Sequence, residues 1–153
     1  MDLRLALYQP DIAGNTGTLL RLGACLDLGL EVIEPAGFDL SDRALKRAGM
    51  DYLDTAKLTR HVDFAAFEAW RHDSGRRLVL FTTKGALPYT EFTYRPTDVL
   101  LFGRESAGVP GDIHALADAR VVIPMNPAAR SLNLAVAAAM AAGEALRQTK
   151  AFP

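Results

Sequence analysis

The sequence predicts an α/β fold in which helices flank a parallel, Rossmann-like sheet. Three wholly apolar runs, 78–81, 99–102 and 121–123, are typical of strands that are buried on both faces of such a sheet. Segments with helical spacing of their apolar residues alternate with the strands, and a loop follows each apolar run. Because ligands of parallel sheets bind at the carboxyl ends of the strands, we expect the functional site in the loops after these runs.

Length and composition indicate a single domain over residues 1–153. Half of the residues are hydrophobic, no repeat or linker interrupts them, and the formal net charge is −1. This balance argues against a protein that binds nucleic acids through overall basicity. A local basic patch would still be compatible with an RNA substrate, because the position of the charges decides the attraction to phosphate.

Cysteine usage and hydropathy argue against several other classes. The single cysteine, Cys25, rules out an internal disulfide and a multi-thiolate metal site, and its leucine neighbours predict a core position. The charges of Asp2 and Arg4 argue against a signal peptide. The longest uncharged apolar run, 134–143, is too short to span a bilayer. We therefore expect a cytoplasmic protein that needs neither a membrane nor a metal ion.

The N-terminal half starts with an alternating segment, 3–8, that predicts a strand followed by a loop at Gln9. A glycine-containing loop is expected at 14–17. Leucines at helical spacing then predict a helix that extends to Leu28, and 30–33 predicts a second strand. The chain thus opens with a strand, a loop, a helix and a strand.

Helix N-caps are predicted at Ser41, Asp63 and Ser131. The last of these would open a long helix that runs through Arg147 and is apolar on every side as far as Gly143. Because such a surface is unstable in water, we expect a partner subunit to cover it. The free N–H groups at the start of this helix would lie beside the strand-end loops, where they could hold polar groups of a small-molecule cofactor.

Motifs of several common enzyme classes are incomplete. The glycines at 14–17 lack the G-x-G-x-x-G spacing of dinucleotide-binding loops, and the sequence contains no P-loop. Ser106 is not in the central position of a hydrolase nucleophile elbow. The three histidines, His61, His72 and His114, lie in polar segments that favour the protein surface, and they lack metal-ligand spacing with the cysteine.

Three segments instead resemble the motifs of the SpoU-type 2′-O-methyltransferases within the SPOUT class. They are Asn-Thr-Gly-Thr-Leu-Leu-Arg at 15–21, Leu-Phe-Gly-Arg-Glu-Ser-Ala-Gly-Val-Pro at 101–110, and Ile-Pro-Met at 123–125 followed by Arg-Ser-Leu-Asn-Leu at 130–134. Their order and spacing agree with that family over essentially the whole chain. The short length, together with segments 34–38 and 47–52, is similar to the branch that modifies the wobble ribose, nucleotide 34 of tRNA.

The resemblance implies S-adenosylmethionine-dependent 2′-O-methylation of C or U at the wobble position. It also implies a C-terminal trefoil knot and a homodimer formed through the C-terminal helix. The residues that it assigns to the cofactor site are Phe81, Thr82, Gly103, Ile123, Met125, Ser131, Leu132 and Asn133. A glycine at 103 would let the backbone approach the ligand closely.

The resemblance further implies that Arg21 is the catalytic arginine and that Asn15 supports it. A guanidinium stays protonated in proteins, so Arg21 is unsuited to act as a general base. We expect it instead to position the ribose hydroxyl and the neighbouring phosphate and to stabilise the developing alkoxide. In a dimer, this arginine could act on the cofactor of the neighbouring subunit.

The implied partner is the anticodon stem-loop of tRNA. Candidate phosphate contacts are the basic residues Arg43, Lys46 and Arg47, which share a predicted helix, and Arg104. Two positions depart from the family pattern: Thr18 stands where a second asparagine is frequent, and Arg104 where proline is common.

Other functions stay open at this point. The protein could methylate another site in tRNA or rRNA, or it could bind RNA without catalysis. An enzyme of the same fold that methylates a base nitrogen would need a carboxylate base, which Glu105 or Asp112 could supply. The arginine motif argues against base methylation.

Overall fold

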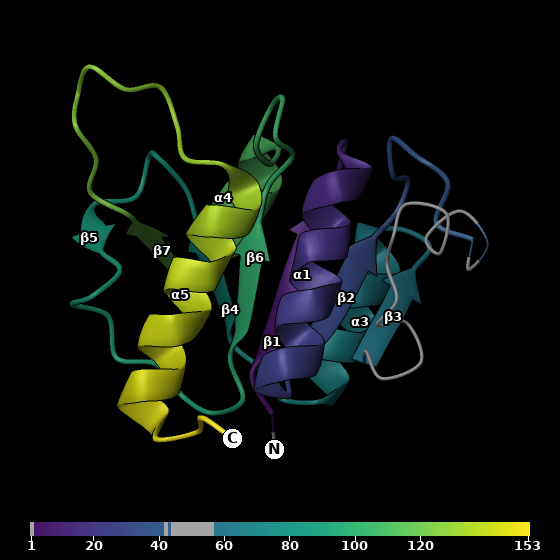
Figure 1. Ribbon diagram of the computed structural model, residues 1–153, viewed down its shortest axis with the longest axis horizontal. Helices are drawn as coiled ribbons and strands as arrows, with labels where there is room; N and C mark the ends of the chain where they lie inside the picture. The colour runs from purple at the N-terminus through teal and green to yellow at the C-terminus, as the bar shows by residue number, and fades with distance from the viewer. Residues whose placement is uncertain (1, 42, 44–56) are drawn as a thin grey trace.

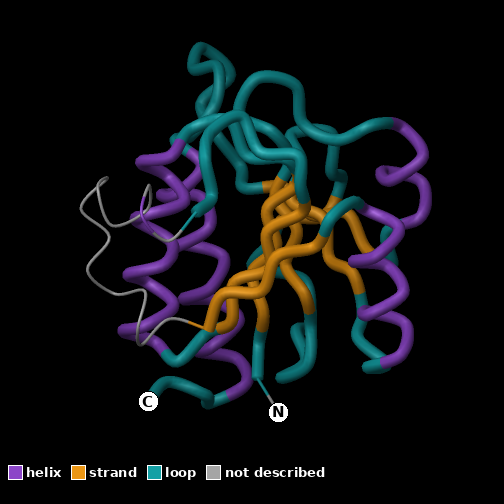
Figure 2. Tube along the Cα trace, turned by 90° about the vertical axis from the view of Figure 1, so that its right-hand side faces the viewer, coloured by secondary structure: helices purple, strands orange, loops and turns teal. Residues whose placement is uncertain are grey.

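Helices cover both faces of one parallel sheet in the computed structural model, which describes residues 2–41, 43 and 57–153 (Figures 1 and 2). The sheet has the strand order β3-β2-β1-β6-β4-β7-β5, and the described strand pairs are parallel. The strands are β1 Arg4–Tyr8, β2 Gly29–Ile33, β3 Lys57–His61, β4 Leu78–Phe81, β5 Leu87–Pro88, β6 Val99–Phe102 and β7 Ala119–Val122. The helices are α1 Ala13–Leu26, α3 Phe64–Asp73, α4 Gly111–Leu116 and α5 Leu134–Thr149. The predicted fold class is therefore confirmed.

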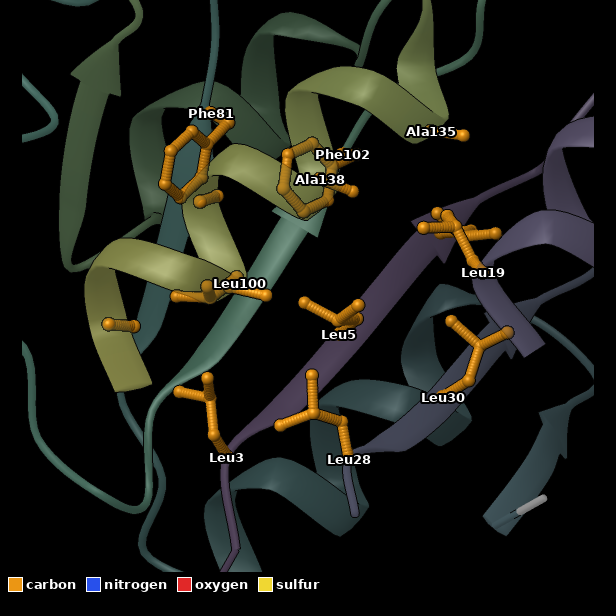
Figure 3. Packing of buried hydrophobic residues seen from close by; sticks show 14 of the residues in the cluster. Leu3, Leu5, Leu19, Leu28, Leu30, Phe81, Leu100, Phe102, Ala135 and Ala138 are labelled. Carbon is orange, nitrogen blue, oxygen red and sulfur yellow. The ribbon is translucent and has the colours of Figure 1, made fainter. Parts of the chain in front are cut away.

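Two hydrophobic cores lie on opposite faces of the sheet, because successive strand residues point to opposite sides. In β6, Leu100 and Phe102 belong to the core beneath α1 and α5, whereas Val99 and Leu101 belong to the core beneath α3 and α4. This double burial explains why the central strands read as uninterrupted apolar runs. Figure 3 shows Leu100 and Phe102 against α5, and Leu5 on β1 between α5 and α1.

Small residues let α5 lie close to the sheet. Ala138, Ala141, Ala142 and Ala145 of this helix are fully buried. The helix runs beside α1 on the same face of the sheet (Figure 1). This packing fixes the start of α5 next to the loops that leave the carboxyl ends of β1 and β6.

Two predicted boundaries are wrong. Helix α1 begins at Ala13, so the glycines at 14–17 lie inside a helix rather than in a loop. The N-cap position, Ile12, offers no polar side chain that would announce this start. Helix α5 begins at Leu134 and is capped by Asn133 instead of Ser131, because the Asn133 side chain accepts the N–H groups of the first helical turn.

Some predicted environments are also wrong. Cys25 is exposed on α1 instead of lying in the core. His61 is buried against Glu31 instead of lying at the surface, because it closes the polar edge strand β3, which the sequence pattern did not reveal. Strand β5 and helix α4 were likewise not predicted. The Asp63 cap of α3 is confirmed by its 2.8 Å bond from the Ala66 N–H.

Candidate cofactor and acceptor site

The loops at the carboxyl ends of β1, β6, β4 and β7 converge at one edge of the sheet. They comprise residues 9–12, 103–110, 82–86 and 123–133. In Figure 2 these loops gather above the strands. The segments come from distant parts of the chain, and parallel pairing brings them together because every strand ends at the same edge.

The first of two adjoining pockets is bordered by the loops after β4 and β7 and contains about 410 Å³ of empty space. Its lining residues are Thr82, Thr83, Val122, Ile123, Met125, Ser131, Leu132 and Ala137. Apolar walls with a few hydroxyl groups are typical of sites for small organic molecules. Thr82, Ile123, Met125, Ser131 and Leu132 are five of the eight residues that the sequence assigned to the cofactor. We call this space the cofactor pocket.

The second pocket contains about 700 Å³ of empty space and shares Ser131, Leu132 and Ala137 with the first. Its other lining residues are Ile12, Asn15, Gly103, Arg104, Glu105, Asn133 and Leu134. We call it the acceptor pocket. Two predicted cofactor residues, Gly103 and Asn133, border this space rather than the first pocket.

Phe81 is the one predicted cofactor residue whose side chain lies in the core. Its ring stacks on Phe102 with the centroids 5.0 Å apart, and only 8% of the residue is exposed. Phe81 could therefore contact a ligand through its backbone, which continues directly into the pocket residue Thr82.

A chain of hydrogen bonds joins three loops beside the acceptor pocket. The carboxylate of Glu105 accepts the Asp11 backbone N–H at 2.9 Å and the Asn15 side-chain amide at 3.4 Å. The side-chain amide of Asn133 donates to the side-chain oxygen Oδ1 of Asn15 at 3.1 Å. The Oδ1 atom of Asn133 in turn accepts the Ala135 N–H at 2.9 Å. We call Asp11, Asn15, Glu105 and Asn133 the Glu105 network.

The sequence indicated only part of this network. Asn15 and Asn133 were both predicted site residues, but Glu105 was considered only as the base of an alternative reaction. Asp11 was missed altogether. Its position directly after the Gln9-Pro10 pair, in the loop that follows a strand, was the available signal.

Arg104 lies on the rim of the acceptor pocket and forms an ion pair with Asp11 at 2.7 Å. Ser106 donates both its hydroxyl, at 2.6 Å, and its backbone N–H, at 3.2 Å, to the same carboxylate. The hydrogen bonds from Ser106 and then from Arg104 lower the pKa of Asp11 below its ordinary value. Asp11 is therefore ionised at neutral pH.

Gly103 is required by the loop itself. A Cβ atom at this position would lie 2.5 Å from the backbone carbon of Gly108. The loop closes through two backbone hydrogen bonds between Arg104 and Gly108, at 2.8 and 2.9 Å. Close approach of two backbone segments thus explains this glycine without any ligand.

The remaining predicted residues lie outside the two pockets or outside the described part of the chain. Arg21 is exposed on α1, one and two-thirds turns after the buried Asn15. Arg43 is exposed. Lys46, Arg47 and the segment 47–52 lie outside the described residues. Asp112, considered as a base, is exposed on the short helix α4 and does not line the acceptor pocket.

The described residues contain no group of three or more histidine, cysteine, aspartate or glutamate side chains that could hold a metal ion. None of the described helices is both long and apolar enough to cross a membrane.

Comparison with known proteins gives a consistent result. The model of the SpoU rRNA Methylase family matches residues 2–143. A tRNA (cytidine(34)-2′-O)-methyltransferase of Beijerinckia indica is 66% identical over 148 residues, which cover 97% of this chain and 92% of the relative.

Solved structures agree with this match. One described as giving structural insights into the 2-OH methylation of C/U34 on tRNA superposes with a TM-score of 0.88 at 44% identity, covering 95% of each chain. The SpoU methyltransferase AviRb of Streptomyces viridochromogenes, solved in complex with the cofactor AdoMet, has a TM-score of 0.85 at 30% identity. That match covers 96% of this chain and 57% of the other. The protein belongs to the SpoU methylase family.

Proposed function

We propose that this protein transfers a methyl group from S-adenosylmethionine to the ribose 2′-hydroxyl of the wobble nucleotide, C or U at position 34 of tRNA. The observation that carries the proposal is the pair of adjoining pockets, which share Ser131, Leu132 and Ala137. A donor in one pocket and a ribose in the other would meet across these residues. The names of the relatives support the nucleotide and the type of RNA. A tRNA substrate also favours a cytoplasmic protein.

The residues of the cofactor pocket fit S-adenosylmethionine. Ile123, Met125 and Leu132 offer an apolar surface for the adenine ring, and Thr82 and Ser131 offer hydroxyl groups for its polar parts. When bound, S-adenosylmethionine supplies an electrophilic methyl group on a positively charged sulfur.

Arg21 and Asn15 are the proposed catalytic residues. The hydroxyl must lose its proton as it attacks the methyl group, and a guanidinium cannot accept that proton. Arg21 therefore orients the hydroxyl and the adjoining phosphate and stabilises the developing negative charge. The proton passes to the phosphate or to water. Asn15 is 8% exposed and is held by Glu105 and Asn133, which fixes the orientation of its amide.

We propose a homodimer that forms through α5. This helix buries one face against the sheet but leaves Val136 and Met140, one turn apart, 48% and 39% exposed. Leu132, in the loop just before the helix, is 38% exposed. Ile12 of the neighbouring loop is 50% exposed. A second copy of the chain would cover this apolar stripe. Sedimentation of the wild type as a dimer, and of Met140→Glu as a monomer, is the expected result.

Such a dimer would allow Arg21 to serve the partner's cofactor. In an ideal helix, a residue six positions after Asn15 lies about 9 Å further along the axis and about 120° around it. Arg21 is thus directed away from the pocket that Asn15 borders. Mixed dimers of Arg21→Ala and Asn133→Ala subunits test this arrangement. Regained activity requires one intact site assembled from both chains.

Binding of tRNA would depend on local charge, because the chain as a whole carries a net charge of −1. Arg43, Lys84 and Arg130 are exposed. Lys84 and Arg130 belong to loops that border the cofactor pocket. A dimer doubles each of these patches.

The deciding experiment is methyl transfer from labelled S-adenosylmethionine to unmodified tRNA, followed by nuclease digestion and mass spectrometry of the nucleosides. We expect 2′-O-methylcytidine or 2′-O-methyluridine at position 34. Label on a base nitrogen, label in rRNA alone, or RNA binding without any transfer would each contradict the proposal.

A further inference from the structure

The segment after β1 and the segment after β6 are held together by a compact group of contacts at the rim of the acceptor pocket. The chain turns at Gln9, which has a φ of 44° in the left-handed region that non-glycine residues seldom adopt. This turn directs Asp11 toward the loop 103–108. Asp11 then receives the three hydrogen bonds from Arg104 and Ser106.

A second guanidinium nitrogen of Arg104 donates to the side-chain oxygen of Gln9 at 3.4 Å. The arginine therefore contacts two residues of one segment while its own backbone forms the tight loop with Gly108. Its side chain is 39% exposed, but both terminal guanidinium nitrogens donate to protein groups, one to Gln9 and one to Asp11. We call Asp11, Arg104 and Ser106 the clasp.

We propose that Arg104 and Asp11 are positioning residues for methyl transfer: the clasp holds Glu105 against Asn15 and thereby fixes the wall of the acceptor pocket. This inference rests on the proposed function, and it gives Arg104 a role other than the phosphate contact that the sequence suggested. Glu105 lies between Arg104 and Ser106 in the sequence, so it cannot move without moving these two clasp residues.

The path from the clasp to the reacting groups is short. Glu105 accepts the backbone N–H of Asp11 and the amide of Asn15, so the carboxylate touches both the clasp and the proposed catalytic asparagine. Asn15 in turn accepts a hydrogen bond from the side-chain amide of Asn133, so a shift of Asn15 would also move Asn133. The cofactor pocket, in contrast, contains no residue of the clasp. Loss of the clasp should therefore affect turnover far more than cofactor affinity.

The two roles of Arg104 predict different kinetics. If it positions Glu105, Arg104→Ala lowers kcat about tenfold, since small displacements of catalytic groups cost one to two orders of magnitude. The KM for tRNA and the Kd for S-adenosylmethionine then stay within about threefold of the wild type. If Arg104 binds a phosphate, kcat is retained, KM for tRNA rises, and the slope of log affinity against log salt falls by about one.

Coupling between the two residues provides a second test. We expect Asp11→Ala to lower kcat as Arg104→Ala does, and the double variant to be no slower than the slower single variant, because both substitutions remove the contact between Arg104 and Asp11. Arg104→Lys should regain part of kcat, since lysine can still reach the carboxylate. The matched control is Arg60→Ala, which removes a half-exposed arginine that belongs to the edge strand β3, lines neither pocket and forms a 3.0 Å ion pair with Glu34. It should leave kcat unchanged.

Assays of the full-length protein with S-adenosylmethionine and unmodified tRNA, with melting curves for each variant, separate the outcomes. An inactive wild type contradicts the proposed function itself. An active wild type with an unchanged kcat in folded Arg104→Ala, or with additive effects in the double variant, overturns the clasp. If Arg104→Ala does not fold, Asp11→Asn removes the charge from the 2.7 Å ion pair at almost the same side-chain volume, and an unchanged kcat in that variant also overturns the proposal.

Discussion

Two glutamates join separate chain segments in this molecule, and their surroundings differ. Glu31 in β2 is fully buried and lies between Arg4 of β1 and the Nε2 of His61 in β3, which is 2.9 Å away. Phe67 and Trp70 pack against the histidine ring with centroids 5.4 Å from it. We call Glu31, Arg4 and His61 the Glu31 cluster. Glu105, in contrast, is partly exposed and borders a pocket.

The comparison separates stability from function. In the Glu31 cluster, each polar group bonds to another polar group and two aromatic rings pack on the histidine, so the fully buried Glu31 carboxylate has no access to a substrate. In the Glu105 network, the same residue type binds one backbone N–H and one weakly held amide beside open space. A buried carboxylate whose partners are all internal supports the fold, whereas a carboxylate at a strand-end pocket can support chemistry.

The substitution with the largest predicted effect disrupts the Glu31 cluster. Glu31→Ala should lower the free energy of unfolding by about 3–5 kcal/mol, because it removes a fully buried carboxylate that bonds both Arg4 and His61 and leaves Arg4 with its 2.8 Å ion pair to Asp2. Urea unfolding followed by circular dichroism measures the loss. The kcat of the fraction that stays folded should be within about twofold of the wild type. A loss of stability below about 1 kcal/mol would show that the cluster is not a structural element.

The next effect concerns Arg21, which lies outside both glutamate groups. Arg21→Ala should reduce kcat by about 100- to 1,000-fold, the usual consequence of removing a group that stabilises transition-state charge. Its unfolding free energy should change by less than about 0.5 kcal/mol, as is usual for exposed positions. Single-turnover methyl transfer measures the rate, and retention of the wild-type rate would contradict the catalytic assignment.

Asn133 connects the Glu105 network to the start of α5, so two substitutions can separate its roles. Asn133→Ala should lower stability by about 1 kcal/mol through loss of the helix cap, and should also reduce activity. Asn133→Asp keeps the capping oxygen but cannot donate to Asn15, so we expect near wild-type stability with reduced activity. Melting curves and initial rates of both variants provide the comparison. Wild-type activity in Asn133→Asp would contradict a role for the bond to Asn15.

The smallest effect involves a third carboxylate, on α5 away from both groups. Hydrogen bonds from Arg147 and then Gln148 lower the pKa of Glu144 to about 2. Because the folded pKa lies below the ordinary value of 4.5, the stabilisation is present above pH 4.5 and disappears as the pH falls toward 2. Melting temperatures between pH 7 and pH 2 should show a small deficit for Glu144→Gln that vanishes in acid. A deficit that grows in acid would contradict this pKa.

The central strands and the site loops could be predicted from sequence because their signals are local. The apolar runs that became β4, β6 and β7 report burial directly, and the loops behind them contain most of the residues that line the pockets. The start of α1 could not be predicted, because Ile12 gives no capping signal and glycines at 14 and 17 suggest a turn.

Burial and pairing that depend on residues far away in the chain also could not be predicted from the sequence. His61 occurs in a polar segment, and only its pairing with Glu31, 30 residues away, shows that it is buried. Asp11 and Arg104 are 93 residues apart, so no local pattern links them. The sequence suggested only an RNA contact for Arg104, because an isolated arginine in a loop near a site carries no sign of its partner Asp11. The contact with RNA stays a prediction.

The hydrogen bond between Asn15 and Asn133 spans 118 residues and has a consequence for how the protein matures. Contacts of such sequence separation form late in folding, after the loop entropy of the intervening chain has been overcome. Strands β1, β2, β3, β4 and β6, which are complete by residue 102, can pair while the last helix is still being synthesised. A nascent chain would thus hold much of its sheet before its catalytic centre exists, and its ability to methylate RNA would wait for the docking of α5 and for the second subunit that we propose to join there.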